Sequence, residues 1–196
     1  MEAMPHRAQI DPYSVSAFDV VNKLKRLTWR IAWLLLFRPT PVMLHGWRSL
    51  LLGMFGARIG ASNYIYPTAT IWAPWNLVTG CSVTIGPNAE VYNPALVDLA
   101  HHTIISQGSY LCGATHDYNS PTFTYVSKPI ISGAYAWVCA RSIVLPGVTL
   151  GEGSVLGAGS VASKNLDEWC VYAGNPAVKV KERRRDWQGV EGRNVS

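Results

Sequence analysis

The residue best suited to chemistry is His116, which lies in a Thr-His-Asp-Tyr run over positions 115–118. An imidazole can take a proton from a hydroxyl group at neutral pH, so this side chain could act as a general base. Asn93 comes earlier in the chain, and its amide could hydrogen-bond a substrate or a developing oxyanion. The alternatives are a solvated loop histidine and a turn asparagine, so the elements that position both residues decide between these roles.

A six-residue repeat that begins at Ile59 provides those elements. An aliphatic residue recurs every six positions, and a small residue usually follows four positions later. Twelve of the fourteen repeat positions are Ile, Leu or Val; the full set is Ile59, Ile65, Ile71, Thr79, Ile85, Val91, Leu99, Ile105, Leu111, Ser132, Val138, Val144, Leu150 and Leu156. This period is too long for a helix and too regular for simple strand alternation, and it predicts short strands joined by tight turns.

Two interruptions of the repeat define its geometry. The steps from Ile71 to Thr79 and from Val91 to Leu99 are eight residues long, and each ends a group of three repeats, so the full period is 20 residues. That period predicts a three-sided coil with one enlarged corner, stacked so that strands pair in parallel about 4.8 Å apart. An antiparallel sandwich is the alternative, which the phased repeat disfavours. The periodicity does not give the hand of the coil.

One insertion breaks the repeat between Leu111 and Ser132, over residues 113–131. It leaves the coil at the enlarged corner, with His116 at its start and Asn93 on the same edge one coil earlier. An extra loop in a strict repeat commonly holds the functional residues. We therefore predict a catalytic His116 and a substrate-facing Asn93.

The composition limits the possible partners. A hydrophobic content of 48% with 15% charged residues is typical of a packed globular protein. The net charge of +5 is concentrated in residues 23–38 and 179–185, which would suit an anionic membrane or a phosphate-bearing ligand. No nucleic-acid-binding module is visible, and we expect no nucleic-acid partner. The longest apolar run, residues 31–37, falls well short of the roughly 20 residues that span a bilayer.

The cysteines and the absence of a visible signal peptide predict a cytoplasmic protein with reduced thiols and no zinc site. The four cysteines are widely spaced and form no CxxC pair: Cys81, Cys112, Cys139 and Cys170.

The N-terminal region predicts a helical cap. Residues 20–37 and 45–54 are expected to form two helices, separated by Pro39 and Pro41, that cover the open first coil. The apolar and basic residues 23–38 also suit transient contact with a membrane surface. The predicted organisation is an arm and cap over residues 1–58, a β-helix of about five coils over 59–163, and a C-terminal segment with a short helix and a basic tail over 164–196.

Several motifs together carry a family resemblance: Ile85-Gly86, Tyr92-Asn93, Thr115-His116-Asp117-Tyr118, Leu145-Pro146-Gly147-Val148 and Gly174-Asn175-Pro176-Ala177. Over about residues 22–182 the chain resembles the hexapeptide-repeat O-acetyltransferases, above all the colanic acid biosynthesis acetyltransferase group and more distantly the galactoside and maltose acetyltransferases. The resemblance implies a left-handed parallel β-helix that forms a homotrimer, with active sites between neighbours. It also implies acetyl-CoA as co-substrate, no metal, and direct acetyl transfer to a sugar hydroxyl of an exopolysaccharide, a glycan or its precursor.

The same resemblance implies roles for individual residues. His116 matches the general base, and Asn93 matches an asparagine of the substrate cleft. Five residues match positions that bind coenzyme A, namely Trp137, Ala140 and Ala158 along the pantetheine arm and Ser163 and Lys164 near the nucleotide end. A flat wall of small residues lets a long thioester lie along it, and a lysine can meet phosphate. Rim packing of the tryptophan and a solvated lysine are the alternatives.

The chain departs from the family pattern at some positions. Val178 stands where many relatives carry an arginine able to meet the 3′-phosphate, with Lys179 and Lys181 close by. Other functions stay open: transfer to an amino sugar, serine or an antibiotic, a non-catalytic scaffold, and a zinc hydrase that uses His101 and His102. The adjacent positions of these two histidines at an expected turn disfavour metal ligation.

Overall fold

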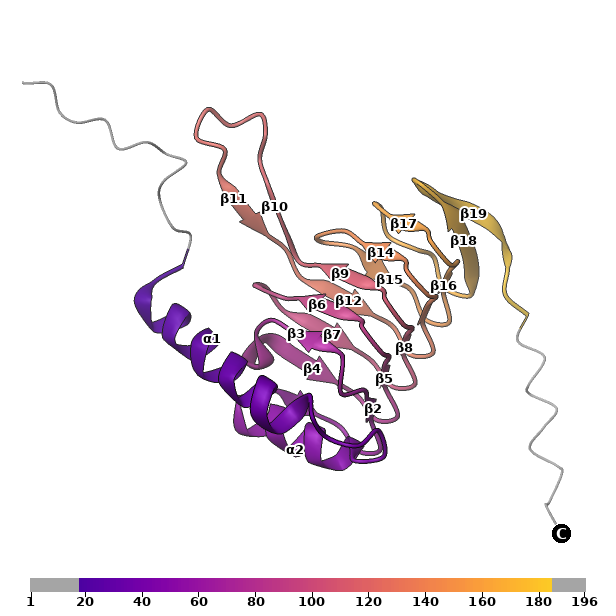
Figure 1. The fold of residues 1–196 in the computed structure, drawn as a ribbon. Helices are drawn as coiled ribbons and strands as arrows, with labels where there is room; N and C mark the ends of the chain where they lie inside the picture. The colour runs from indigo at the N-terminus through magenta and orange to yellow at the C-terminus, as the bar shows by residue number, and fades with distance from the viewer. Residues whose placement is uncertain (1–17, 185–196) are drawn as a thin grey trace, which may run out of the picture.

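The computed structural model describes residues 18–184, and the expectations for residues 1–17 and 185–196 lie outside it. The described chain forms a left-handed parallel β-helix with helices at its N-terminal end and an antiparallel strand pair at its other end (Figure 1). No helix between residues 18 and 184 combines the length and the apolar content that crossing a membrane requires.

The β-helix has three faces, and each face is a sheet of parallel strands. The first face holds β1 (Arg58–Ile59), β4 (Leu77–Thr79), β7 (Val97–Leu99), β12 (Ile130–Ser132) and β15 (Thr149–Leu150). The second face holds β2 (Tyr64–Ile65), β5 (Thr84–Ile85), β8 (Ile104–Ile105), β13 (Trp137–Val138), β16 (Val155–Leu156) and β18 (Cys170–Gly174). The third face holds β3 (Thr70–Ile71), β6 (Glu90–Tyr92), β9 (Tyr110–Cys112), β14 (Ile143–Val144) and β17 (Val161–Ala162). The five predicted coils are confirmed, and β18 begins a sixth.

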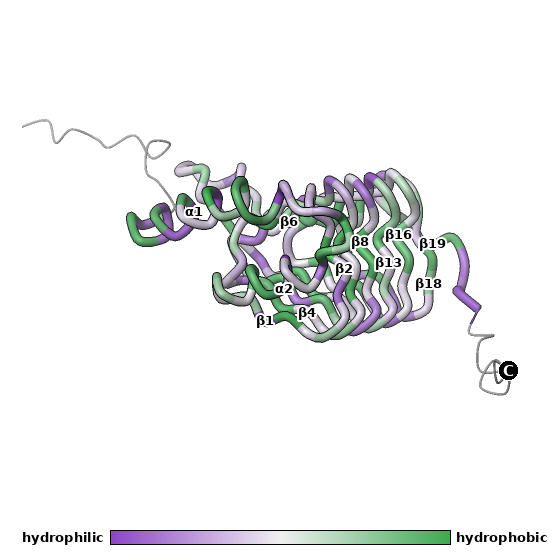
Figure 2. Tube along the Cα trace, turned by 60° about the horizontal axis from the view of Figure 1, so that its bottom comes forward, coloured by the Kyte–Doolittle hydropathy of each residue, from purple (hydrophilic) through white to green (hydrophobic). Residues whose placement is uncertain are grey.

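The repeat positions form the core. On the first face, the residues that pair in register from coil to coil are Ile59, Thr79, Leu99, Ser132 and Leu150. All fourteen repeat positions are buried except Ile59, which is partly buried. The two polar members are satisfied inside the core, because Asn63 Nδ2 donates to Thr79 Oγ1 at 2.7 Å and Thr103 Oγ1 lies 2.9 Å from Ser132 Oγ. Figure 2 shows the stacked coils from a second direction.

The stacking leaves backbone carbonyls at the N-terminal end without a preceding coil to pair with. Within the β-helix, carbonyls such as Ile85 O accept from the coil before, here from Tyr66 N at 3.0 Å. Three helices cover the first coil: α1 (Val20–Ala32), the π-helix η2 (Trp33–Phe37) and α2 (His45–Met54). Their side chains supply the missing donors. Trp29 Nε1 donates to Ile71 O at 2.6 Å, and Trp33 Nε1 donates to Ala69 O at 2.9 Å. The predicted cap is confirmed.

Arg48 of α2 is the centre of this cap. Its side chain is fully buried, and Nε donates to Ile65 O of the first coil at 2.6 Å. Nη1 donates to Thr40 Oγ1 and Pro41 O, and Nη2 donates to Val42 O, so one guanidinium fixes the turn between the helices. Burial lowers the pKa of Arg48, because desolvation disfavours the charged form.

The C-terminal end differs from the prediction. A short helix was expected near Lys179, but Ala177–Glu182 form strand β19, which pairs antiparallel with β18. The segment alternates between apolar and charged residues (Ala-Val-Lys-Val-Lys-Glu), and this period of two favours a strand. Lysines on the outer strand suit a sheet edge that faces water.

The insertion folds as a hairpin of β10 (Ala114–His116) and β11 (Tyr125–Ser127), which pair antiparallel. The coil resumes at Ile130, where β12 begins, so the predicted end of the loop at residue 131 was two residues too late. Figure 1 shows this hairpin projecting from the body of the β-helix. The fold therefore presents the start of the insertion on a defined two-stranded element.

We predict that Arg48→Met lowers the free energy of unfolding by about 3–5 kcal/mol, because it leaves several buried carbonyls without a donor. Chemical denaturation followed by circular dichroism measures this loss. The control is Arg58→Met at an exposed position, for which a change below about 0.5 kcal/mol is expected. Equal stability of the two variants would show that the cap does not depend on the buried guanidinium.

Candidate active site

The hairpin fixes the imidazole of His116. The residue ends β10 and pairs in register with Tyr125 of β11. Its Nδ1 lies 2.9 Å from the backbone oxygen of Phe123. Because a carbonyl can only accept, Nδ1 carries the hydrogen in this contact, and Nε2 of the neutral ring keeps its lone pair. The side chain is exposed, so this lone pair can serve a substrate hydroxyl.

Two aromatic rings pack against the imidazole of His116. Phe123 stacks on it with ring centroids 4.5 Å apart and planes inclined by 12°. Tyr125 meets it edge-on, with a centroid distance of 5.5 Å. Phe123 has a φ of 45°, a left-handed conformation that costs a bulky residue about 1–3 kcal/mol. This local strain brings both the carbonyl and the ring of one residue onto His116.

Asp117 does not orient the base in this structure. Its Oδ1 accepts the backbone N–H of Asn119 at 3.0 Å, and its own N–H donates to Thr124 O at 2.8 Å. The carboxylate therefore stabilises the turn of the hairpin. The sequence had left the orienting group open, and Phe123 fills that role.

Tyr125 joins the hairpin to the coils beneath it. Its hydroxyl lies 3.1 Å from the hydroxyl of Tyr92, which follows the core residue Val91 in β6. Burial, and then this hydrogen bond, raise the pKa of Tyr125, so its phenol is neutral at physiological pH. A neutral phenol at this point supports the base without placing a charge beside it.

Asn93 lies at the enlarged corner where the repeat places it, but its side chain is buried there. The residue is fully buried at the enlarged corner, where its Oδ1 accepts from Ala73 N at 2.9 Å and its Nδ2 donates to Ala73 O at 2.8 Å. Gly113 packs on this corner so closely that an added Cβ would lie 2.5 Å from Tyr92 O. These contacts favour a structural role for Asn93, which anchors the root of the hairpin, over contact with a substrate.

Three of the predicted coenzyme A residues lie together on another part of the β-helix. Trp137 is on the outer side of the second face, and its Nε1 donates to Ser106 Oγ at 2.9 Å. Ala140 and Ala158 lie in turns between the second and third faces of consecutive coils, joined by a 2.9 Å hydrogen bond from Gly159 N to Ala140 O. The two alanines place small side chains in two stacked turns of this edge, with exposed Arg141 next to Ala140.

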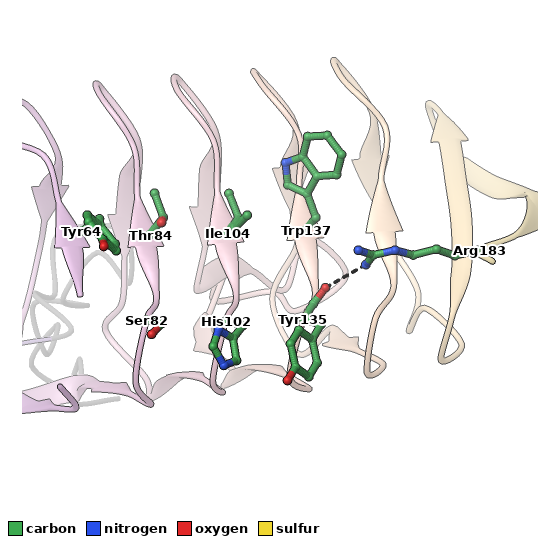
Figure 3. A pocket seen from close by; sticks show the side chains of 8 residues that line it. All are labelled: Tyr64, Ser82, Thr84, His102, Ile104, Tyr135, Trp137 and Arg183. Carbon is green, nitrogen blue, oxygen red and sulfur yellow. Dashed lines mark hydrogen bonds between the residues drawn. The ribbon is translucent and has the colours of Figure 1, made fainter. Parts of the chain in front are cut away.

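The outer surface of the second face extends beyond Trp137 along the coils (Figure 3). A cavity of about 280 Å³ lies along it, and its lining residues are Tyr64, Ser82, Thr84, His102, Ile104, Tyr135, Trp137 and Arg183. Arg183 Nη1 donates to Tyr135 O and Gly153 O, both at 3.0 Å, and so ties the C-terminal segment to this face.

The remaining two predicted cofactor residues, Ser163 and Lys164, are exposed and follow β17 on the third face. They lie at the corner between the third and first faces, which is also the corner from which the hairpin leaves two coils earlier. The whole third face separates this corner from Ala140 and Ala158. One protomer therefore does not bring His116 together with the alanine edge.

The adjacent histidines have separate surroundings. His101 Nδ1 accepts from Cys81 N at 3.0 Å, and His102 stacks on Tyr135 with centroids 4.8 Å apart. Among residues 18–184, no group of three or more His, Cys, Asp or Glu side chains is arranged to hold a metal ion. Burial raises the pKa of the Cys139 thiol, next to Ala140, so this cysteine is protonated and weakly nucleophilic at neutral pH.

Comparison with known proteins places this geometry in a family. No protein-family model matches the sequence. The chain is 38% identical over 162 residues to a putative colanic acid biosynthesis acetyltransferase of Escherichia coli (strain K12), across 83% of this chain and 89% of the relative. It is 32% identical over 118 residues to a putative acetyltransferase of Staphylococcus aureus (strain COL), across 57% of this chain and 58% of the relative.

Solved structures share the fold. A galactoside acetyltransferase in complex with coenzyme A superposes with a TM-score of 0.73 at 20% identity, across 88% of each chain. A maltose O-acetyltransferase from Clostridium difficile 630 superposes with a TM-score of 0.73 at 19% identity, across 85% of this chain and 90% of that chain. The fold is thus that of the hexapeptide-repeat acetyltransferases. Given the 38% identity over most of both sequences, the chain belongs to the colanic acid biosynthesis acetyltransferase family.

We predict that neutral His116 carries its proton on Nδ1, because the Phe123 carbonyl accepts from that atom. Nitrogen-15 NMR of histidine-labelled protein above pH 8 measures the tautomer, and the His116→Gln variant assigns the signal among the five histidines of the chain. A dominant Nε2–H form would contradict the geometry, because the basic lone pair would then face the Phe123 carbonyl.

Proposed function

We propose that the chain is an acetyl-CoA-dependent O-acetyltransferase that modifies a sugar hydroxyl of an exopolysaccharide, a glycan or its precursor. The observation that carries this proposal is the imidazole of His116, held on a projecting hairpin with Nε2 available as a base. The names of the colanic acid, galactoside and maltose acetyltransferases that the chain resembles support a carbohydrate acceptor.

The proposed reaction is direct transfer. Nε2 of His116 takes the proton of the acceptor hydroxyl while the hydroxyl oxygen attacks the thioester carbonyl carbon. The new C–O bond forms, the C–S bond breaks, and the coenzyme A thiolate leaves and takes up the proton from the imidazolium. The hydrogen bond from Nδ1 to Phe123 O holds the ring in one orientation throughout, and it strengthens when the ring becomes positively charged.

The alanine edge suits the donor. A pantetheine arm is long and narrow, and Ala140 and Ala158 leave space for it along two stacked turns, with Trp137 at one side. Exposed Lys164 can meet a phosphate of the nucleotide. Near Val178, Lys179 lies 3.9 Å from Glu182 and is already paired, so exposed Lys181 is the better candidate for the 3′-phosphate.

The separation of these groups within one protomer supports an active site shared between chains. We propose a homotrimer with parallel axes, in which the hairpin of one chain lies against the alanine edge of its neighbour. Threefold symmetry then builds three equal sites. The exposed rings of Tyr118 and Phe123 on the hairpin offer apolar surfaces against which a sugar ring can stack.

His116→Ala is expected to lower kcat by about 10²–10⁴ with little change in KM for acetyl-CoA, since the imidazole acts on the acceptor proton. Release of free thiol in the presence of a panel of sugar acceptors measures the rate. The matched control is His101→Ala, which removes another exposed imidazole far from the hairpin. An unchanged rate for His116→Ala would refute its role as the base.

Mixing two inactive variants tests the shared site. His116→Ala lacks the base, and Ala158→Trp blocks the pantetheine edge. If each site combines the base of one chain with the edge of its neighbour, co-expression of both variants restores about a quarter of wild-type activity in randomly mixed trimers. If both groups of a site come from one chain, every site in the mixture remains defective and no activity returns.

A further inference from the structure

The cap helices present an apolar face to solvent. On α1 and η2, five aliphatic side chains spaced three or four residues apart are each at least half exposed, namely Val20, Leu24, Leu27, Ile31 and Leu35, and Val21 beside them is exposed as well. This spacing places the five side chains along one side of the helical segment, opposite the buried Trp29 and Ala32 that pack on the first coil. A surface helix normally turns polar residues outward, whereas this helix turns an aliphatic stripe to solvent.

The apolar face extends over the second helix. Trp47, Leu50 and Met54 of α2 are exposed by 40%, 58% and 71%, and Met43 in the connecting turn is exposed by 82%. Trp47 Nε1 donates to Leu36 O at 2.8 Å, so the two helices are held together at this point. These exposed apolar side chains of the cap helices are here called the cap face, and exposed apolar surface of this kind marks a site that binds a partner.

The charges around the cap face are positive except for Asp19, whose carboxylate caps the N-terminus of α1 and accepts from Asn22 N. Residues 20–89 contain no Asp or Glu, while Lys23, Lys25, Arg26, Arg30 and Arg38 all lie within the first helical segment or directly after it. Lys23 and Arg30 lie beside the aliphatic stripe, and both are exposed. A second copy of the same helix would bring cations against cations, whereas an anionic surface would complement them.

Beside the stripe, between the first helical segment and the third face, lies a cavity of about 290 Å³ that combines guanidinium groups with indole rings. Its lining residues are Arg26, Trp29, Arg30, Trp33, Leu34, Arg38, Thr70, Ile71 and Trp72. Arg26 lies over the ring of Trp72 at 4.5 Å, and Arg38 lies over Trp33 at 5.4 Å, so two of the three cations are held at the cavity by aromatic rings. Guanidinium groups that converge in this way suit a phosphate.

We propose that the cap face is a docking site for an anionic lipid bilayer, with the aliphatic stripe at the level of the acyl chains and a lipid phosphate in the arginine cavity. A helix that is apolar on its outer side, flanked by lysine and arginine and free of acidic residues, has the character of helices that lie in the plane of a membrane interface. Indole rings favour the same depth. The enzyme then works at the membrane surface.

Vesicle flotation with the full chain tests this proposal. The protein is expected to float with vesicles that contain phosphatidylglycerol, and about tenfold less with pure phosphatidylcholine. Leu27→Glu and Arg30→Gln should each reduce the bound fraction about five- to tenfold, the first by removing apolar contact and the second by removing a cation. Matched controls at the opposite end of the β-helix are Val180→Glu and Arg184→Gln, which should float like the wild type.

Further measurements distinguish a membrane from other possible partners of the cap face. Inorganic phosphate at constant ionic strength should not displace the protein, because the bilayer supplies most of the binding; full displacement would reduce the site to a free-phosphate site and overturn the proposal. Leu27→Glu that floats like the wild type would also overturn it. The proposal would also be overturned if the wild type failed to float and Leu27→Glu had a lower oligomer mass in light scattering. That result would assign the cap face to a contact between copies of the chain. Thermal unfolding of each variant confirms that it is folded.

Discussion

Neighbouring coils of this protein exchange backbone hydrogen bonds, and carbonyls that face the N-terminal end of each coil accept from the coil before. The first coil keeps carbonyls at Ile65, Ala69 and Ile71 that no earlier strand can reach. The side chains of Trp29, Trp33 and the buried Arg48 donate hydrogen bonds to these carbonyls, in place of a preceding coil. These unpaired carbonyls explain why the inner side of the cap carries buried hydrogen-bond donors. They do not explain the apolar outer side, and for that reason we assign the outer side to a separate partner.

The same stacking positions the chemistry. Parallel pairing places each enlarged corner directly over the one before, so Asn93 can hold Ala73 by both its amide atoms while Gly113 packs against Tyr92. The hairpin rises from this packed corner, and the strained backbone of Phe123 orients the imidazole of His116. A regular repeat thus supplies the rigidity, and the single irregular segment supplies the reactive group.

The repeat, its 20-residue period and the helical cap could be predicted from the sequence because aliphatic spacing and turn residues report directly on buried strands. The position of His116 followed from the same periodicity. The roles of Phe123 and Asn93 could not be predicted, since one depends on a carbonyl turned by a positive φ and the other on pairing across coils. The β-branched and aromatic residues Thr124, Tyr125 and Val126 were a usable signal for β11. The C-terminal helix was a wrong prediction, since Ala177–Glu182 form strand β19, in which Val178 and Val180 alternate with Lys179 and Lys181.

The central claim is that the base of one chain activates an acceptor hydroxyl beside an acetyl donor bound by its neighbour. A crystal structure of the oligomer with acetyl-CoA tests it most directly. The account predicts that the thioester lies along Ala140 and Ala158 of one protomer, with the partner's His116 facing it across a gap that holds one hydroxyl oxygen about 3 Å from each. A thioester bound away from every His116 side chain in the assembly would contradict it.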